Sequence, residues 1–210
     1  MIGGRRLESA DKILKEYHEY QAKIGSRVAL YRVVARAFGI ESALYPGSHV
    51  DIAPSLVIPK VTYIDSYKGT IQFFRQMDVI QSFLEQQKEY PEACEISFIG
   101  SDYEAELGVD PVDLIISQFA GFVGQATKRY LKPGGILLCN DSHADATLAR
   151  FDETFELIGV IDEKNQISSA YLENFFQLSK GRAVDLANVR KTMKGPKYTH
   201  MAENYLFRKK

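Results

Sequence analysis

Residues 42–65 read SALYPGSHVDIAPSLVIPKVTYID, in which two short apolar runs flank a Pro-Gly turn and an irregular loop. The first run ends at Tyr45, and the second is β-branched and ends just before Asp65. This pattern predicts two buried strands and the crossing between them. In open α/β sheets, ligands bind outside the carboxyl ends of the strands, where backbone groups are free. The sequence therefore predicts a ligand site that includes the turn after the first strand and Asp65 after the second.

The rest of the chain alternates between helical and strand patterns. Apolar residues recur at helical spacing over 7–38, and a break near Gly25 predicts two helices, the second capped by Ser26 and ended by Gly39. Further strands are expected at 95–99, 112–117, 136–139, 155–161 and 205–208, and further helices at 68–90, 119–131, 145–151 and 169–178. This alternation predicts an α/β, Rossmann-like fold with a mostly parallel sheet of about seven strands and helices on both faces.

Length and composition indicate how the chain is organised. At 210 residues it fits one main domain, residues 41–210, with an N-terminal helical extension, residues 1–40, packed on it. Cys94 and Cys139 each lie in or beside an apolar run and offer no metal or disulfide spacing, which fits a reducing cytoplasm. The first residues, MIGGRRLESADK, contain no apolar signal core, and no apolar run reaches the roughly 18 residues of a membrane span. We therefore expect a cytoplasmic protein without a membrane segment.

Charge is balanced overall but not along the chain. The formal net charge is -1, so the whole molecule shows no general affinity for polyanions. The last segment is basic: against Asp185 and Glu203 it carries Lys180, Arg182, Arg190, Lys191, Lys194, Lys197, Arg208, Lys209 and Lys210. Such a segment is usually a solvated surface and less often a contact for phosphate, nucleic acid or an acidic partner. Both interpretations stay open.

Residues 112–141 read VDLIISQFAGFVGQATKRYLKPGGILLCND and predict a strand, a helix, a Lys-Pro-Gly-Gly turn and a second strand. Proline stops a helix, and the glycines permit a tight turn into the next strand. Three consecutive predicted strands end at Tyr45, Asp65 and Asp102. On these features, residues 29–210 resemble the class I S-adenosylmethionine-dependent methyltransferases. The alternative explanation for the Lys-Pro-Gly-Gly segment is an ordinary helix-to-strand connection, which occurs in many α/β proteins.

The resemblance implies a site for S-adenosylmethionine at these strand ends. In the family, the three positions carry a glycine-rich loop, an acid that binds the ribose hydroxyls, and a residue near the adenine; the end of the fourth strand lies close to the substrate. The implied cofactor-binding residues are Tyr45, Pro46, Gly47, Ser48, Asp65, Ser101, Asp102, Ser117 and Gln118. Two of these have structural alternatives, because Gly47 also suits a type II turn and Asp65 also suits a cap of the following helix. No catalytic residue and no metal ligand is predicted.

The first loop departs from the family pattern. The family has a Gly-x-Gly run, whereas this loop has only Gly47, preceded by Pro46, which lacks a backbone donor, and followed by the bulkier His49 and Val50. The glycine-rich loop is therefore degenerate. Either its polar side chains bind the cofactor instead or the site is altered or lost; these side chains are Ser48, Asp51 and Ser55. His49 also suggests a general base, although one histidine in a polar loop is more often only exposed.

A second polar cluster follows the fifth predicted strand. Asn140, Asp141 and His143 come directly after that strand and are expected on the same rim as Asp65. They are candidates for substrate binding, and a helix cap by Asp141 or Ser142 fits the same residues.

The resemblance favours an S-adenosylmethionine-dependent methyltransferase that acts on a small molecule. The alternative is a non-catalytic methyltransferase-like protein that binds a partner through its basic C-terminal segment. Nucleic-acid substrates are less favoured, because 117–120 read SQFA, whereas some base-modifying relatives have an acid or Asn followed by Pro-Pro and an aromatic residue. A nicotinamide-dependent oxidoreductase lacks its Gly-x-Gly-x-x-Gly run here. Oligomerisation is left open by the sequence.

Overall fold

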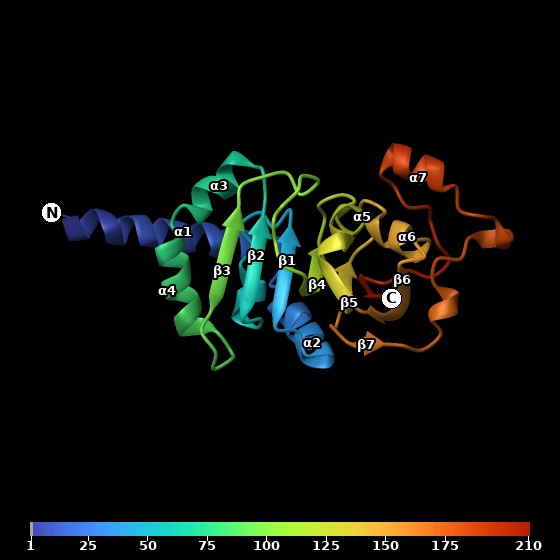
Figure 1. Ribbon diagram of the computed structural model, residues 1–210, viewed down its shortest axis with the longest axis horizontal. Coiled ribbons are helices and arrows are strands. Elements are labelled where there is room, and N and C mark those ends of the chain that lie inside the picture. The colour runs from blue at the N-terminus through green and yellow to red at the C-terminus, as the bar shows by residue number, and fades with distance from the viewer. Residues whose placement is uncertain (1) are drawn as a thin grey trace.

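An eight-stranded sheet forms the centre of the protein, with the strand order β3-β2-β1-β4-β5-β8-β6-β7 (Figure 1). The computed structural model describes residues 2–210, and their side chains from Lys12 onward. The strands are β1 (Ser42–Pro46), β2 (Lys60–Ile64), β3 (Glu95–Ile99), β4 (Val112–Ser117), β5 (Leu131–Cys139), β6 (Phe155–Ile161), β7 (Ile167–Ser168) and β8 (Asn204–Lys209). The predicted α/β fold with a mostly parallel sheet is confirmed.

The directions of the strands place most of their carboxyl ends at one edge of the sheet. β3, β2, β1, β4 and β5 pair in parallel, and β8 is antiparallel to both β5 and β6, so that β6 runs in the same direction as the first five. Asn204, the first residue of β8, pairs with Ile161, the last residue of β6. The carboxyl ends of β1, β2, β4, β5 and β6 and the beginning of β8 therefore share one edge, which we call the carboxyl edge.

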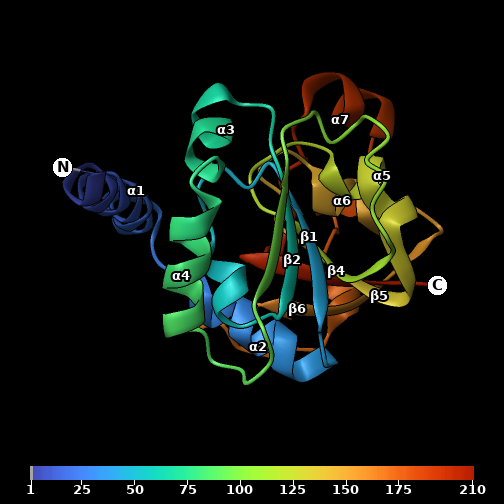
Figure 2. The same ribbon diagram turned by 60° about the vertical axis from the view of Figure 1, so that its left-hand side comes forward.

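Helices cover both faces of the sheet (Figure 2). They are α1 (Ile2–Ile24), α2 (Val28–Phe38), α3 (Lys68–Phe74), α4 (Met77–Gln87), α5 (Val123–Thr127), α6 (Asp145–Arg150) and α7 (Leu186–Thr192), with short 3-10 turns at Ala53–Leu56, Lys128–Tyr130, Leu172–Asn174 and Ser179–Gly181. Alternate side chains of one strand enter different cores: Tyr45 packs in the core under α1, α2 and α4, and Leu44 in the core under α5 and α6. This two-sided burial explains why the strands read as continuous apolar runs.

The N-terminal helices follow the predicted pattern with one correction. Gly25 and Gly39 have φ values of 79° and 61°, so the glycines break the helical pair and end α2, as expected. Ser26 does not cap α2; Arg27 occupies the position before it and makes no side-chain cap. The N-terminal part of α1 extends away from the sheet (Figure 1).

Three predicted helices are shorter than expected. The segment 68–90 forms two helices that are interrupted at Arg75 and Gln76, and both helices have buried apolar residues. Residues 119–122 are not helical, and positive φ values at Phe119 and Gly121 delay α5 until Val123. The segment 169–178 has only a 3-10 turn.

That last segment is ordered by aromatic packing rather than by helical hydrogen bonds. The Phe176 backbone has a φ of 61°, which no α-helix accommodates. Its ring is buried 4.7 Å from the Tyr205 ring and 5.1 Å from the Tyr198 ring, measured between centroids. Tertiary contacts with residues far along the chain therefore override the local helical pattern.

The Lys-Pro-Gly-Gly segment, residues 132–135, lies within β5 rather than ahead of it. Val112 pairs with Leu131, and the next pair on β4 joins Leu114 to Ile136, so the segment is an irregularity in the ladder. Gly134 has a φ of 77° in this bend. The predicted fifth strand at 136–139 is thus the inner part of a longer strand.

Across residues 2–210, no helix combines the length and the apolar character that crossing a membrane requires.

Candidate functional site

A cavity of about 800 Å³ opens at the carboxyl edge of the sheet. Its wall comes from the loops after β1, β2, β4, β5 and β6, from the start of β8, and from the turn between α1 and α2. Gly47, Asp65 and Gln118 line it from the first, second and fourth strands, and Arg27 lines it from the helical turn. Cavities of this size and place are where α/β proteins bind small ligands.

Asp65 connects the first two loops of the edge and keeps capacity for a ligand. Its Oδ2 accepts a hydrogen bond from the His49 backbone N–H at 2.9 Å, and its Oδ1 accepts one from the Tyr67 N–H at 2.8 Å. A carboxylate has about four lone-pair positions. Half of them therefore remain for hydroxyl or amine donors in the cavity.

Gly47 allows two loops to approach closely. Its φ is 64°, and a Cβ built on it would lie 2.2 Å from Cβ of Ala120, in the loop after β4. Its N–H donates to the Ile64 carbonyl oxygen at 2.8 Å, which fixes the turn against β2. The single glycine of the degenerate loop is thus required for the turn and for the packing of the loop after β4.

The His49 side chain is held between two tyrosines. Its ring stacks on the Tyr20 ring at 4.8 Å and on the Tyr67 ring at 5.9 Å, with interplanar angles of 11° and 24°. Its Nδ1 accepts a hydrogen bond from the Val50 N–H at 2.8 Å, so that nitrogen is not available as a base. The ring therefore builds the cavity wall and joins α1 to the edge.

The polar side chains of the first loop are buried instead of facing the cavity. Asp51 is fully buried and does not line the cavity; Tyr31 Oη donates to its Oδ2 at 3.0 Å, and Tyr45 Oη donates to the same oxygen at 3.2 Å. Arg27 Nη1 lies 3.5 Å from the same oxygen. Burial raises the pKa of Asp51, and the Arg27 charge partly offsets this. Ser55 is likewise buried. This network fixes α1 and α2 over the site.

Three buried carboxamides form a hydrogen-bonded chain across the carboxyl edge. Asn140 Nδ2 donates to Gln118 Oε1 at 3.0 Å, and Gln118 Nε2 donates to Asn204 Oδ1 at 2.8 Å. The exposed fractions of Gln118, Asn140 and Asn204 are only 5%, 7% and 9%. All three line the 800 Å³ cavity, and Asn204 Nδ2 donates to no atom of the described residues. The chain thus ends in a free N–H donor at the ligand site.

Two aspartates fix the segments that follow β4 and β5 through hydrogen bonds. Asp145 is buried and accepts hydrogen bonds from Ser117 Oγ at 2.6 Å and from the Gly124 N–H at 2.8 Å. Burial is the main cause that raises the pKa of Asp145 to about 6. Asp141 accepts from the Thr147 N–H and hydroxyl in the first turn of α6, and burial raises its pKa as well.

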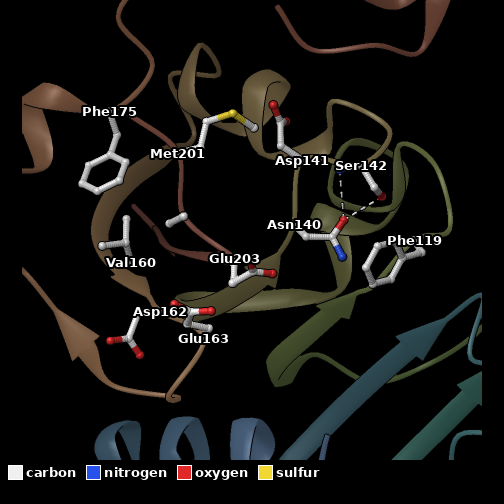
Figure 3. A pocket seen from close by; sticks show the side chains of 11 residues that line it. Phe119, Asn140, Asp141, Ser142, Val160, Asp162, Glu163, Phe175, Met201 and Glu203 are labelled. Atoms are coloured by element: carbon white, nitrogen blue, oxygen red, sulfur yellow. Dashed lines mark hydrogen bonds between the residues drawn. The ribbon is translucent and has the colours of Figure 1, made fainter. Parts of the chain in front are cut away.

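A second cavity, of about 510 Å³, adjoins the first (Figure 3). We call it the acidic pocket; it is lined by Phe119, Asn140, Asp141, Ser142, Val160, Asp162, Glu163, Phe175, Met201, Ala202 and Glu203. Phe119, Asn140, Asp162, Glu163 and Glu203 line both cavities. The Phe119 ring, which is 58% exposed, also packs 5.1 Å from the Arg27 guanidinium. The two cavities are therefore neighbouring parts of one open site.

Comparison with known proteins defines the fold. No protein-family model matches the sequence, and no curated protein matches it either. A methyltransferase from Geobacter sulfurreducens aligns over 75% of this chain and 89% of its own, with 14% identity and a TM-score of 0.51. The N-methyltransferase NodS from Bradyrhizobium japonicum aligns over 86% and 92%, with 16% identity and a TM-score of 0.42.

The chain has the fold of the class I methyltransferases. At 14% identity the likeness to the Geobacter structure shows the fold alone. Within that methyltransferase fold, the antiparallel β8 is inserted between β5 and β6, and the two-residue β7 extends the sheet beyond β6.

The predicted cofactor residues divide into three groups in this methyltransferase-like site. Gly47, Asp65 and Gln118 line the 800 Å³ cavity together. Four others are buried beneath the edge: Tyr45, Pro46, Ser48 and Ser117. Ser101 and Asp102 lie in the loop after β3 and do not line the cavity; the exposed Asp102 accepts from the Glu104 N–H at 2.9 Å.

Several lining residues were not predicted from the sequence. Asp162 and Glu163 directly follow a predicted strand, so the rule that located Asp65 would have found them. Glu203 precedes β8 and Asn204 begins it, and both reach this edge only because β8 is antiparallel. His143 does not line either cavity. Among the described residues, no three His, Cys, Asp or Glu side chains are arranged to hold a metal ion.

Proposed function

We propose that the protein is an S-adenosylmethionine-dependent methyltransferase that acts on a small molecule. The observation that carries this proposal is the 800 Å³ cavity at the carboxyl edge of a methyltransferase fold, with the half-buried Asp65 carboxylate in its wall. The acidic pocket, which adjoins this cavity, supplies space for a methyl acceptor.

The residues of the cavity fit a nucleoside cofactor. Asp65 has unused acceptor capacity for the two ribose hydroxyls, after binding the His49 and Tyr67 N–H groups. The free Nδ2 of Asn204 can donate a hydrogen bond to an oxygen of the ligand. Because Gly47 has no side chain, the turn after β1 stays compact. When bound, S-adenosylmethionine would supply an electrophilic methyl carbon.

The chain's own residues would act by positioning. A nucleophile that is held in line with a methyl group needs little acid-base chemistry, so proximity and orientation contribute most of the rate. The carboxamide chain of Asn140, Gln118 and Asn204 is buried and hydrogen-bonded from end to end, which makes it a fixed part of the wall of the 800 Å³ cavity. Tyr20 in α1 and Arg27 in the turn after it line the same cavity.

Calorimetric titration with S-adenosylmethionine tests this proposal. We expect saturable binding that weakens at least tenfold, about 1.4 kcal/mol, in Asp65→Ala, because the ribose acceptor is lost. Asp65→Asn keeps one acceptor oxygen and should weaken binding less. Asp102→Asn is the matched control: its carboxylate follows the next strand but lies outside the cavity, so affinity should not change.

Two results would overturn the proposal. One is the absence of saturable binding at millimolar cofactor, and the other is equal affinity of the native chain and Asp65→Ala. Thermal unfolding of each variant separates a binding effect from a folding effect, since Asp65 also holds two backbone N–H groups.

A further inference from the structure

The acidic pocket collects carboxylates from two strands that are distant in sequence. Asp162 and Glu163 follow β6, and Glu203 precedes β8, whose first residue pairs with the last residue of β6. Figure 3 shows these three side chains together on one wall of the pocket. The antiparallel pairing of β6 and β8 therefore places their charges next to each other.

These carboxylates have no cationic partner among the described residues. No Lys, Arg or His side chain of that part of the chain lines the pocket, and none of the three carboxylates forms an ion pair there. Asp162 is held by its own loop, since its Oδ1 accepts from the backbone N–H groups of Lys164 and Gln166. Like charges that share a small space repel each other, and a bound cation removes this repulsion.

Amide side chains beside the carboxylates add hydrogen-bond donors for a ligand. Asn140 is 93% buried, as its exposed fraction is 7%, and its Nδ2 donates within the described residues only to Gln118, so one of its two N–H groups has no partner there. It lines both cavities. Asn204, beside it in the carboxamide chain, has no partner for Nδ2 in the same part of the chain. Both amide groups therefore keep N–H donors that can bind an oxygen atom of a ligand.

Apolar side chains form the remaining wall. Phe119 and Phe175 lie on opposite sides of the pocket in Figure 3, with Val160 between the Phe175 ring and the carboxylates and with Met201 near Asp141. Aromatic and apolar walls with a few polar groups are typical of sites for small molecules. The pocket thus combines apolar and aromatic side chains, three carboxylates and an amide N–H donor.

We propose that the acidic pocket binds the methyl acceptor, and that this acceptor is a small aromatic amine with an oxygen substituent. Its ammonium group lies among the carboxylates of Asp162, Glu163 and Glu203, its ring lies against Phe119, and its oxygen accepts from the Asn140 amide. The ammonium is the anchor that orients the molecule toward the first cavity. This inference rests on the proposed function for the role of the bound molecule as an acceptor.

Titration with three probe compounds tests the ligand class. Tyramine has all three features, tyrosol replaces the ammonium by a hydroxyl, and 2-phenylethylamine lacks the ring oxygen. With the protein saturated by S-adenosylhomocysteine, we expect tyramine to bind at least tenfold more tightly than tyrosol and more tightly than 2-phenylethylamine. Because the carboxylates are exposed, added salt should reduce the advantage of tyramine over tyrosol.

A double variant tests whether the carboxylates bind the ammonium group. In Glu163→Gln with Glu203→Gln, the preference for tyramine over tyrosol should fall below threefold. Glu153→Gln is the matched control, because Glu153 is also exposed and precedes β6 at the opposite edge of the sheet. This control should keep the full preference.

The inference would be overturned if tyrosol bound as tightly as tyramine, if tyramine did not bind at millimolar concentration, or if the double variant kept the preference. Equal binding of tyramine and 2-phenylethylamine would contradict the role of Asn140. If S-adenosylhomocysteine itself did not bind, the proposed function would fail, whereas the same titrations on the free protein would still report on the pocket. The two failures are therefore distinguishable.

Discussion

At the residue scale, Gly47 meets two requirements that no residue with a side chain meets together. Its φ of 64° is strained for any residue with a Cβ, and an added Cβ would lie 2.2 Å from that of Ala120. Ala120 belongs to the loop that carries Gln118 and Phe119 into the site. A change at Gly47 therefore affects the loops after both β1 and β4.

Gly47→Ala should lower the free energy of unfolding by about 3 kcal/mol, because strain and overpacking add. Gly39→Ala separates the two causes. Gly39 has a similar φ of 61° with no atom within 4 Å of an added Cβ, so only the strain of about 1 kcal/mol is expected. Urea denaturation measures both variants. Equal losses for the two would show that the contact with Ala120 does not constrain Gly47.

Asp145 gives the stability a pH dependence whose sign follows from its raised pKa. The ordinary value is 3.8 and burial raises the pKa to about 6 in the folded chain, so the folded state holds this proton more strongly than the unfolded state. Between these values the carboxyl is ionised in the unfolded state and still protonated in the folded state. The contribution of Asp145 to stability therefore falls as pH rises from about 4 to about 6, and is constant above that.

Comparison with Asp145→Asn isolates this group. The difference in unfolding free energy between the native chain and the variant should decrease by roughly 3 kcal/mol from about pH 3 to about pH 7, because each tenfold change in the ionisation constant corresponds to about 1.4 kcal/mol. Chemical denaturation at several pH values measures it. A difference that rises with pH would contradict the assignment.

At the scale of elements, the N-terminal helices depend on one buried carboxylate. Asp51 accepts hydrogen bonds from Gln21 in α1 and Tyr31 in α2, and it pairs with Arg27 between them. Tyr20 and Arg27 on the same segment line the 800 Å³ cavity. The burial of Asp51 is therefore what connects the helical extension to the site.

Asp51→Asn should cost about 3 kcal/mol, because it leaves the mostly buried Arg27 charge without its counterion. Hydrogen exchange should show the loss first over residues 12–38, while the amides of β5 stay protected. Glu89→Gln is the control, as it removes the partner of Arg32 in a far more exposed ion pair and should change stability by less than about 1 kcal/mol. Uniform loss of protection across the sheet in Asp51→Asn would contradict a local role.

At the scale of the whole molecule, the sequence predicted what depends on local periodicity. Short apolar runs between helical patterns predicted the two strands within 42–65, the strand at 112–117 and the parallel order of the sheet. Strands that are buried on both faces give such continuous apolar runs, which are easy to recognise in a sequence. The ends of the helices were predicted less well. The helix expected at 169–178 is absent because Phe176 packs on Tyr198 and Tyr205, and such distant contacts leave no local pattern.

The site was predictable only where it follows parallel strands. Gly47, Asp65 and Gln118 share the cavity because each comes directly after such a strand. Glu203 and Asn204 required the antiparallel direction of β8, which the sequence pattern does not encode. The burial of Asp51 could not be predicted either, because an acid in a polar loop is expected to be exposed. Only the structure shows that Tyr31 and Arg27 surround it.

A crystal structure of the protein grown with S-adenosylhomocysteine tests the central claim most directly. The chain has a further cavity, of about 710 Å³, at the opposite edge of the sheet, lined by Pro59, Glu95 and Lys132 among others. We predict electron density for the ligand at the carboxyl edge, with the ribose hydroxyls within hydrogen-bond distance of Asp65 and the ligand between Gly47 and Gln118. Density in the opposite cavity, or none at the carboxyl edge at millimolar ligand, would contradict the account.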